Sequence, residues 1–378
     1  MASGRVRHTS HDSGHDSGHN SGHDSGHDSG HDSGHDSGHD SRWISCDASA
    51  INHYSTSHGF AMNIIQAIVL GIVEGITEYL PVSSTGHLIL TAWLLGLGST
   101  PAEKEAVDAF NVIIQGGAIL AVVGLYRQRM AAMILGLLGR NAPGLRLFTL
   151  IVIAFLPAAC LGLTLHHWIE ARFFRPVPVL IALFTGGIAL LAIRRWQERL
   201  FQQQATEGHA AFKSIEDLTV RDALIIGIFQ CVALWPGTSR SMMTIIGGMY
   251  VGLPPARAAE FSFLVGLPTL LGACVLTLGK QLNAHGAGFV DPLGGWAPVA
   301  VGIIVATVSA ALAVHWLVGY LSKHSLAIFG WWRIAVAVVL GVLVMYGDLT
   351  IEPKDRSSPS TVDTIKAGAA DGSPLRAH

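Results

Sequence analysis

Two carboxylates lie four residues apart inside an otherwise apolar stretch of this 378-residue chain, at Glu74 and Glu78. This spacing predicts that both side chains lie on one face of a helix, one turn apart. Two carboxylates that close repel each other, so we expect them to share a proton or a cation. The pair could hold a hard divalent cation through oxygen ligands or act as a general base. The alternative is a buried acid pair that is hydrogen-bonded to neighbouring hydroxyls.

A run of hydroxyls follows the acid pair. Ser83, Ser84 and Thr85 precede Gly86 and His87, so the segment contains a candidate nucleophile and a candidate acid or base. We take Ser84 and His87 as candidate catalytic residues, and Ser83 and Thr85 as candidate substrate ligands. The same residues are also typical of a turn, and their hydroxyls could simply cap a helix that starts near His87.

A second polar run, Pro236-Gly237-Thr238-Ser239-Arg240-Ser241, interrupts another apolar stretch. A permanently charged guanidinium in such a place needs an anionic partner. The hydroxyls around it, together with the N-terminus of a helix that starts after Gly237, make a site shaped for phosphate. Its candidate ligands are Ser239, Arg240, Ser241 and Thr244. The alternative partner of Arg240 is one of the two glutamates, in an internal salt bridge.

The elements that carry these residues are membrane helices. Two apolar regions, 63–97 and 222–251, are cut by the two polar runs, and non-helical backbone at membrane depth is tolerated only where it is buried in protein or lines a wet cavity. The sequence therefore predicts an all-α polytopic membrane protein with six transmembrane helices and two re-entrant helix pairs. Each predicted span approaches or exceeds the roughly 20 residues that a bilayer needs; they lie at 107–126, 146–166, 176–194, 257–279, 297–320 and 327–346.

The two interrupted regions repeat one another. Ala67–Glu74 aligns with Ala223–Gln230, and the polar runs then align after one residue of slippage. Three full spans separate the copies, and three is odd, so the second copy is inserted upside down relative to the first. Inverted-topology repeats with broken helices place a site near the bilayer midplane, where the two breaks meet.

The charges in the loops predict the orientation. The loops at 127–146, 194–221, 251–257 and 321–326 hold eleven Lys and Arg residues, and the loops on the other side hold four. The side with more Lys and Arg residues is predicted to be cytoplasmic, so the break that follows Glu78 opens to the outside.

Composition supports this class and separates two tails. Charged residues make up 13% of the chain and apolar residues 50%, whereas soluble domains carry about 25% charge. A soluble enzyme and a basic nucleic-acid binder are therefore excluded. Residues 1–61 contain a His-Asp-Ser-Gly repeat and are predicted to be disordered, with weak metal binding as the alternative. We expect a membrane domain over 62–348 and a polar tail over 349–378, and one hypothesis is that translation starts at Met62.

The segments Gly71–His87 and Trp235–Thr244 resemble the two signatures of the bacterial undecaprenyl-diphosphatase family, the bacitracin-resistance phosphatases. Phe110–Gln115 and Glu260–Phe263 also look like family segments. The resemblance implies a membrane enzyme that removes one phosphate from undecaprenyl diphosphate, which recycles the lipid carrier for cell-wall synthesis and cell shape and gives bacitracin resistance. It further implies a divalent cation, Mg²⁺ or Ca²⁺, at the glutamate pair. The residues it singles out are Glu74, Glu78, Ser84, His87 and Arg240, with Gln115 as a further substrate ligand.

In the mechanism expected on this basis, Arg240 and backbone N–H groups hold the diphosphate, and the cation neutralises charge. Ser84 attacks the terminal phosphorus and His87 moves the proton, while attack by His87 or directly by water stays open.

The alternative class is a secondary transporter or lipid flippase, since such proteins share this architecture. The expected partners are a polyprenyl diphosphate lipid and the bacterial inner-membrane bilayer, with the site opening to the periplasm. A homodimer is a candidate assembly, and no nucleic acid is expected.

Overall fold

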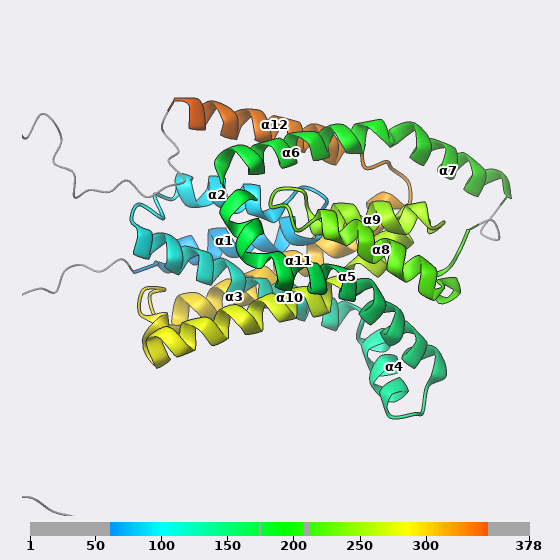
Figure 1. The fold of residues 1–378 in the computed structure, drawn as a ribbon, viewed down its shortest axis with the longest axis horizontal. Coiled ribbons are helices and arrows are strands. Elements are labelled where there is room, and N and C mark those ends of the chain that lie inside the picture. Colours follow the sequence, from blue (N-terminus) through cyan, green and yellow to red (C-terminus); the bar gives the residue numbers. More distant parts are fainter. Residues whose placement is uncertain (1–60, 174, 208–211, 347–378) are drawn as a thin grey trace, which may run out of the picture. The chain divides into compact units, whose positions relative to one another are not determined.

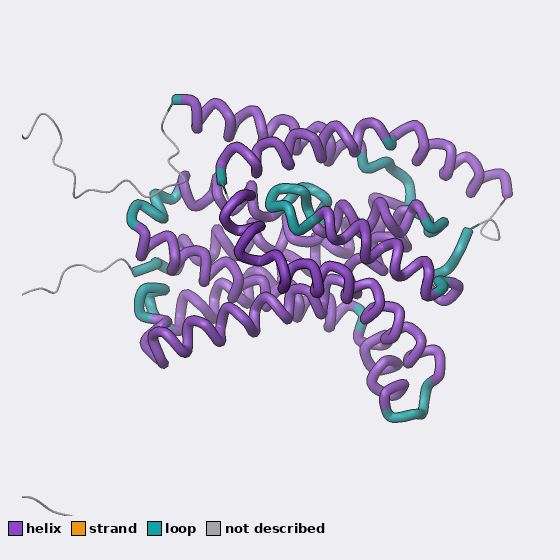
Figure 2. Tube along the Cα trace, viewed as in Figure 1, coloured by secondary structure: helices purple, strands orange, loops and turns teal. Residues whose placement is uncertain are grey.

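The computed structural model of the protein describes residues 61–173, 175–207 and 212–346. They belong to one compact unit, Ser57–His378, and the predicted tails lie outside them apart from residue 61. Regular structure in these ranges is helical, without a strand (Figure 2). In chain order the helices are α1 (Ile64–Tyr79), α2 (Ser84–Leu94), α3 (Pro101–Leu125), α4 (Arg127–Leu137), α5 (Ala142–Phe173), α6 (Pro176–Ala192), α7 (Arg194–Glu207), η3 (Ile215–Asp217), α8 (Val220–Val232), α9 (Arg240–Tyr250), α10 (Pro255–His285), η4 (Gly286–Val290), α11 (Trp296–Leu321) and α12 (Ala327–Met345).

Six helical segments within the described ranges are long and apolar enough to cross a membrane. They correspond one to one with the six predicted spans, so the prediction of a multi-pass α-helical membrane protein is confirmed. Their bounds are Pro101–Leu125, Ala142–Leu165, Val177–Arg199, Pro255–His285, Trp296–Leu321 and Ala327–Met345.

The two predicted interruptions separate α1 from α2 and α8 from α9. These helices have 16, 11, 13 and 11 residues. At 1.5 Å per residue, each is shorter than the roughly 30 Å hydrocarbon core. Pro81 and Pro236 lie in the interruptions, where a proline has no N–H to continue a helix. The arrangement is consistent with two re-entrant pairs.

A serine with unusual backbone geometry ends each interruption. Ser83, with φ of 73°, precedes α2, and Ser239, with φ of 76°, precedes α9. They are the two residues other than glycine with positive φ in the described part of the chain. Positive φ is uncommon for a residue with a Cβ and persists only where the surroundings enforce it. Ser83 and Ser239 are 156 residues apart, the same offset as Ala67 and Ala223, so the one-residue slippage expected from the sequence is wrong. Equivalent positions of the two copies share the same strained turn.

Helix packing also follows the repeat. α1 packs along α11, and its counterpart α8 packs along α5. α3 contacts α10, and α6 runs beside α12 (Figure 1). The pair α1 and α11 approach closely because Gly75 has no Cβ, which would otherwise collide with the carbonyl oxygen of Ala306. Small residues at helix interfaces are typical of packing in lipid. This packing brings the two interruptions, and the residues that flank them, together.

Candidate functional site

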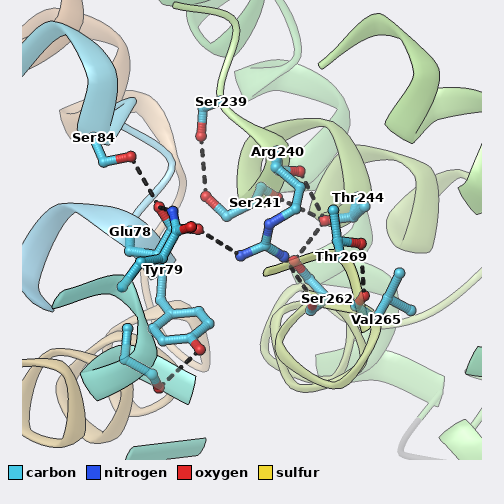
Figure 3. Close-up of polar contacts among 12 residues, drawn as sticks. Glu78, Tyr79, Ser84, Ser239, Arg240, Ser241, Thr244, Ser262, Val265 and Thr269 are labelled. Carbon is cyan, nitrogen blue, oxygen red and sulfur yellow. Dashed lines mark hydrogen bonds and ion pairs between the residues drawn. The ribbon is translucent and has the colours of Figure 1, made fainter. Parts of the chain in front are cut away.

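Glu78 and Arg240 form an ion pair where the two interruptions meet (Figure 3). Nη2 of Arg240 lies 3.1 Å from Oε1 of Glu78, which is 8% exposed. Nη1 donates to the carbonyl oxygen of Ser262 at 3.2 Å, and the guanidinium carbon lies 5.8 Å from the centre of the Tyr79 ring. The structure thus contains the internal salt bridge that the sequence left open as the alternative. This contact joins residues 162 positions apart, one from each copy of the repeat.

Ser84 shares the same carboxylate. It is the first residue of α2, and its Oγ donates to Oε2 of Glu78 at 2.9 Å (Figure 3). Nε2 of Gln115, on α3, donates to the same oxygen at 3.4 Å. Donors from α2, α3 and α9 therefore converge on Glu78. A carboxylate hydrogen-bonded to a hydroxyl in this way can accept its proton and activate it as a nucleophile.

The hydroxyls of the second interruption are hydrogen-bonded within the protein. Oγ of Ser239 accepts a backbone N–H in the first turn of α9 and lies 3.0 Å from Oγ of Ser241. Oγ of Ser241 in turn donates to the carbonyl oxygen of Leu80 at 2.9 Å, which ties this interruption to the end of α1. Oγ1 of Thr244 lies 2.5 Å from Oγ of Ser262, a contact between α9 and α10 that was not predicted. These three predicted substrate ligands thus lie around Arg240 and also hold the backbone that carries it.

His87 is directed towards α12. Its Nε2 accepts a hydrogen bond from Nε1 of Trp332 at 2.7 Å, and its Nδ1 lies 2.8 Å from the carbonyl oxygen of Ser83. An indole N–H can only donate, so Nε2 carries no proton and Nδ1–H is the donor to Ser83. Both ring nitrogens are therefore engaged, and neither contact is to Ser84. Thr85 is half-buried on the first turn of α2.

Glu74 lies one turn before Glu78 and is 1% exposed. Neither of its carboxylate oxygens has a hydrogen-bond partner among the described residues, and the same holds for Oδ1 of Asn111, one turn before Gln115 on α3. Buried polar atoms are ordinarily paired. Oxygen atoms of this kind fit a hard divalent cation. The described residues hold no cluster of three His, Cys, Asp or Glu side chains, so such a cation would keep water or substrate oxygens as further ligands.

Arg333 on α12 is a buried charge that the sequence analysis missed. It is fully buried and lies in the stretch 327–346, which was assigned only as a span. Its guanidinium donates to the carbonyl oxygens of Pro81 and Gly237, one in each interruption. A single arginine inside an apolar span is itself the signal that could have found it, since such charges are rare and functional.

Comparisons with known proteins agree on one family. The family model described as bacitracin resistance protein BacA matches residues 67–339. The chain is 43% identical over 280 residues to the undecaprenyl-diphosphatase of Sorangium cellulosum, covering 74% of this chain and 85% of that one. It is 42% identical over 274 residues to the undecaprenyl-diphosphatase of Methylibium petroleiphilum, covering 72% and 92%. The undecaprenyl-diphosphatase 1 of Burkholderia lata is 44% identical over 284 residues, with 75% and 96% covered.

Proposed function

The chain belongs to the bacitracin resistance protein BacA family, and we infer that it is a membrane hydrolase that converts undecaprenyl diphosphate into undecaprenyl phosphate and inorganic phosphate. The observation that carries this inference is the Glu78 carboxylate that Ser84 and Arg240 share. A hydroxyl, a proton acceptor beside it and a guanidinium can serve as nucleophile, base and phosphate ligand in displacement at phosphorus.

Arg240 is proposed to bind the terminal phosphate. A guanidinium can donate to two phosphate oxygens at once. The phosphate would replace the Glu78 carboxylate as the acceptor of some of the Arg240 N–H groups. α2 begins at Ser84 and α9 at Arg240, so two helix N-termini, whose first N–H groups favour an anion, lie at this pair. The absence of a side-chain cap at the start of α2 supports this role, because the first-turn N–H groups remain available to a ligand.

Ser84 is proposed as the nucleophile. Its Oγ attacks the terminal phosphorus, the bond from that phosphorus to the bridging oxygen breaks, and undecaprenyl phosphate leaves. The Ser84 proton passes to Oε2 of Glu78, a transfer supported by their 2.9 Å separation. Glu78 gives this proton to the departing undecaprenyl phosphate and then accepts one from the attacking water. Water hydrolyses the phosphoserine, and the return of that proton to Oγ releases inorganic phosphate and restores Ser84 and Glu78. His87 contacts Ser83 and Trp332, which supports a role in fixing the turn. This role replaces the proton transfer that the sequence predicted for His87.

Glu74 is proposed to hold the divalent cation, Mg²⁺ or Ca²⁺. Its two unpartnered buried oxygens support this, while those of Glu78 already accept from Arg240, Ser84 and Gln115. When bound, the cation supplies positive charge that neutralises the diphosphate oxygens.

An apolar groove supports a lipid substrate. It has a volume of about 810 Å³ and lies between α1 and α11. Ile72 and Ile76 on α1 and Leu80 just after it line the groove at intervals of four residues, so the groove reaches the residue whose carbonyl oxygen contacts Ser241. We propose that the prenyl chain lies along this groove with its diphosphate at the interruption.

The richer positive charge of the loops at 127–146 and 194–221 supports an inner-membrane orientation with the site opening to the periplasm.

Phosphate release from undecaprenyl diphosphate by the purified full chain in detergent tests the function. We expect release by the wild type, loss of release in Arg240→Ala, and wild-type release in Arg257→Ala, whose side chain is 52% exposed and pairs with Glu260 one turn further along α10. A secondary transporter would instead show ion-gradient-dependent flux in vesicles and no phosphate release. Absence of release by the wild type with divalent cation present would refute the proposal.

A further inference from the structure

The Arg333 guanidinium is held by backbone carbonyl oxygens. The guanidinium is fully buried, and each of its hydrogen bonds in the described structure goes to a carbonyl oxygen. Buried arginines ordinarily face a carboxylate or phosphate. The acceptors are Leu183 at 3.3 Å and Ala182 at 3.1 Å on α6, Pro81 at 3.5 Å in the first interruption and Gly237 at 2.8 Å in the second.

Two of these carbonyls occupy equivalent places in the repeat. Pro81 lies two residues before Ser83, and Gly237 lies two residues before Ser239, the two serines with positive φ. One planar guanidinium therefore donates hydrogen bonds to equivalent carbonyl oxygens of both strained turns. A turn held in a sparsely populated conformation needs surroundings that fix it, and Arg333 contacts both turns at once.

Trp332, the neighbour of Arg333 on α12, reaches the first turn by a second route. Its Nε1–H donates to His87, and His87 donates to the carbonyl oxygen of Ser83. Two adjacent residues of one helix thus fix the backbone on both sides of Val82 and, through Gly237, the turn that carries Arg240. The catalytic side chains Ser84 and Arg240 each begin one residue after a turn held in this way.

We propose that Arg333, assisted by Trp332, is a positioning residue that sets the two interruptions in register so that Ser84 and Arg240 face one phosphate. This rests on the proposed function, because Ser84 and Arg240 act together only in phosphoryl transfer. Arg333 touches neither the Glu78–Arg240 pair nor the Ser84 hydroxyl, so its effect on the rate passes through the backbone. Misplacing a reacting group by about 1 Å can lower a rate 100-fold.

Gly186 on α6 provides a way to move this guanidinium without removing its charge. A Cβ built at Gly186 would lie 2.8 Å from Cζ of Arg333, and the obstructing atoms are the end of a flexible side chain. Gly186→Ala should therefore displace the guanidinium while the helices stay packed. Gly341→Ala on α12 is the matched control, since no atom lies within 4 Å of a Cβ built there.

The experiment measures kcat, KM and thermal stability for Arg333→Lys, Gly186→Ala, the double variant and Gly341→Ala, using undecaprenyl diphosphate. Lysine keeps the charge but cannot span both turns. We expect kcat to fall at least about tenfold in each of the two single variants, with KM changed less than threefold because the prenyl contacts are untouched. The double variant should match Arg333→Lys alone, because the added methyl group then has no guanidinium to displace.

Three results would overturn the inference: wild-type kcat in folded Arg333→Lys or Gly186→Ala, multiplicative losses in the double variant, or losses of kcat that only follow loss of the folded fraction. If Arg333→Lys fails to fold, the kcat of Gly186→Ala compared with that of Gly341→Ala still tests the proposal. Wild-type protein that releases no phosphate would refute the proposed function instead, so the two failures are distinguishable.

Discussion

Replacing Gly266 with alanine tests whether the position of the Arg240 guanidinium sets the rate. Gly266 lies on α10 against this guanidinium, and a Cβ built there would lie 2.7 Å from Cζ of Arg240. Ordinary contacts of a Cβ begin at 3.4 Å, so Cζ must move by at least about 0.7 Å from its 2.7 Å position, and Nη1, which lies nearer to the Cβ, must move further. The obstructing atoms belong to the end of a flexible side chain, so the backbone of α10 can remain where it is.

The size of the effect follows from that displacement. A misplacement of about 1 Å costs on the order of 100-fold in rate, or about 2.7 kcal/mol of transition-state stabilisation. For a shift of about 0.7 Å we expect kcat to fall by about 10- to 100-fold, which is about 1.4 to 2.7 kcal/mol. Alanine has a higher helix propensity than glycine by up to about 1 kcal/mol. The free energy of unfolding should therefore not decrease in parallel with the rate.

The assay is phosphate release from undecaprenyl diphosphate, measured beside thermal unfolding in the same detergent. Gly272→Ala is the matched control, because Gly272 lies on the same helix and no atom lies within 4 Å of a Cβ built there. Gly272→Ala should keep the wild-type kcat. The reasoning is refuted if folded Gly266→Ala retains a kcat within twofold of Gly272→Ala, since the guanidinium would then tolerate the displacement.

Ser84→Ala should lower kcat by at least about 10³-fold, and acid-quenched wild-type enzyme should yield phosphoserine at position 84 by mass spectrometry; recovery of a wild-type enzyme without any phosphoserine would contradict its role as nucleophile. Chelation should abolish phosphate release, and Mg²⁺ or Ca²⁺ should restore it. Glu74→Gln should be inactive and show no rescue by added cation, because the amide has no charge and only one of the two unpartnered carboxylate oxygens remains. In η3, between α7 and α8, hydrogen bonds from Ser214 hold the pKa of Asp217 below its usual range. Its carboxylate therefore stabilises the fold at neutral pH, and this contribution is lost as the pH falls through the lowered folded-state pKa. The melting temperature of Asp217→Asn should lie below that of the wild type at neutral pH and converge with it in acid; a constant difference across that range would contradict the assignment.

The sequence predicted the spans and the interruptions because both depend on local pattern. A bilayer span is a property of about 20 consecutive residues, and a proline with clustered hydroxyls marks a break wherever the fold places it. The repeat also predicted one long-range contact, the approach of the two breaks, because it aligned the break after Glu78 with the break that carries Arg240. The hydrogen bonds of His87 with Trp332 and of Arg240 with Ser262 carry no such signal, because they join residues 245 and 22 positions apart on helices whose rotation depends on packing.

Arg240 and Arg333 have different partners: Arg240 pairs with Glu78, and Arg333 donates to backbone carbonyl oxygens. Gly187 on α6 and Gly330 on α12 each lie against the carbonyl oxygen of the other, at 2.8 and 2.9 Å from a built Cβ, so the two helices cross almost symmetrically. Three residues further on, α12 carries Arg333, but α6 carries the buried apolar Leu190. Arg333 packs against Gly186 and Gly187, whereas Leu191 packs against Gly330, so the helices run antiparallel and Leu190 lies on the opposite side of the crossing from Arg333. The two equivalent turns of the inverted repeat thus share the one guanidinium of Arg333. That asymmetry leaves Arg240, paired with a carboxylate that can release it, as the arginine available to a phosphate.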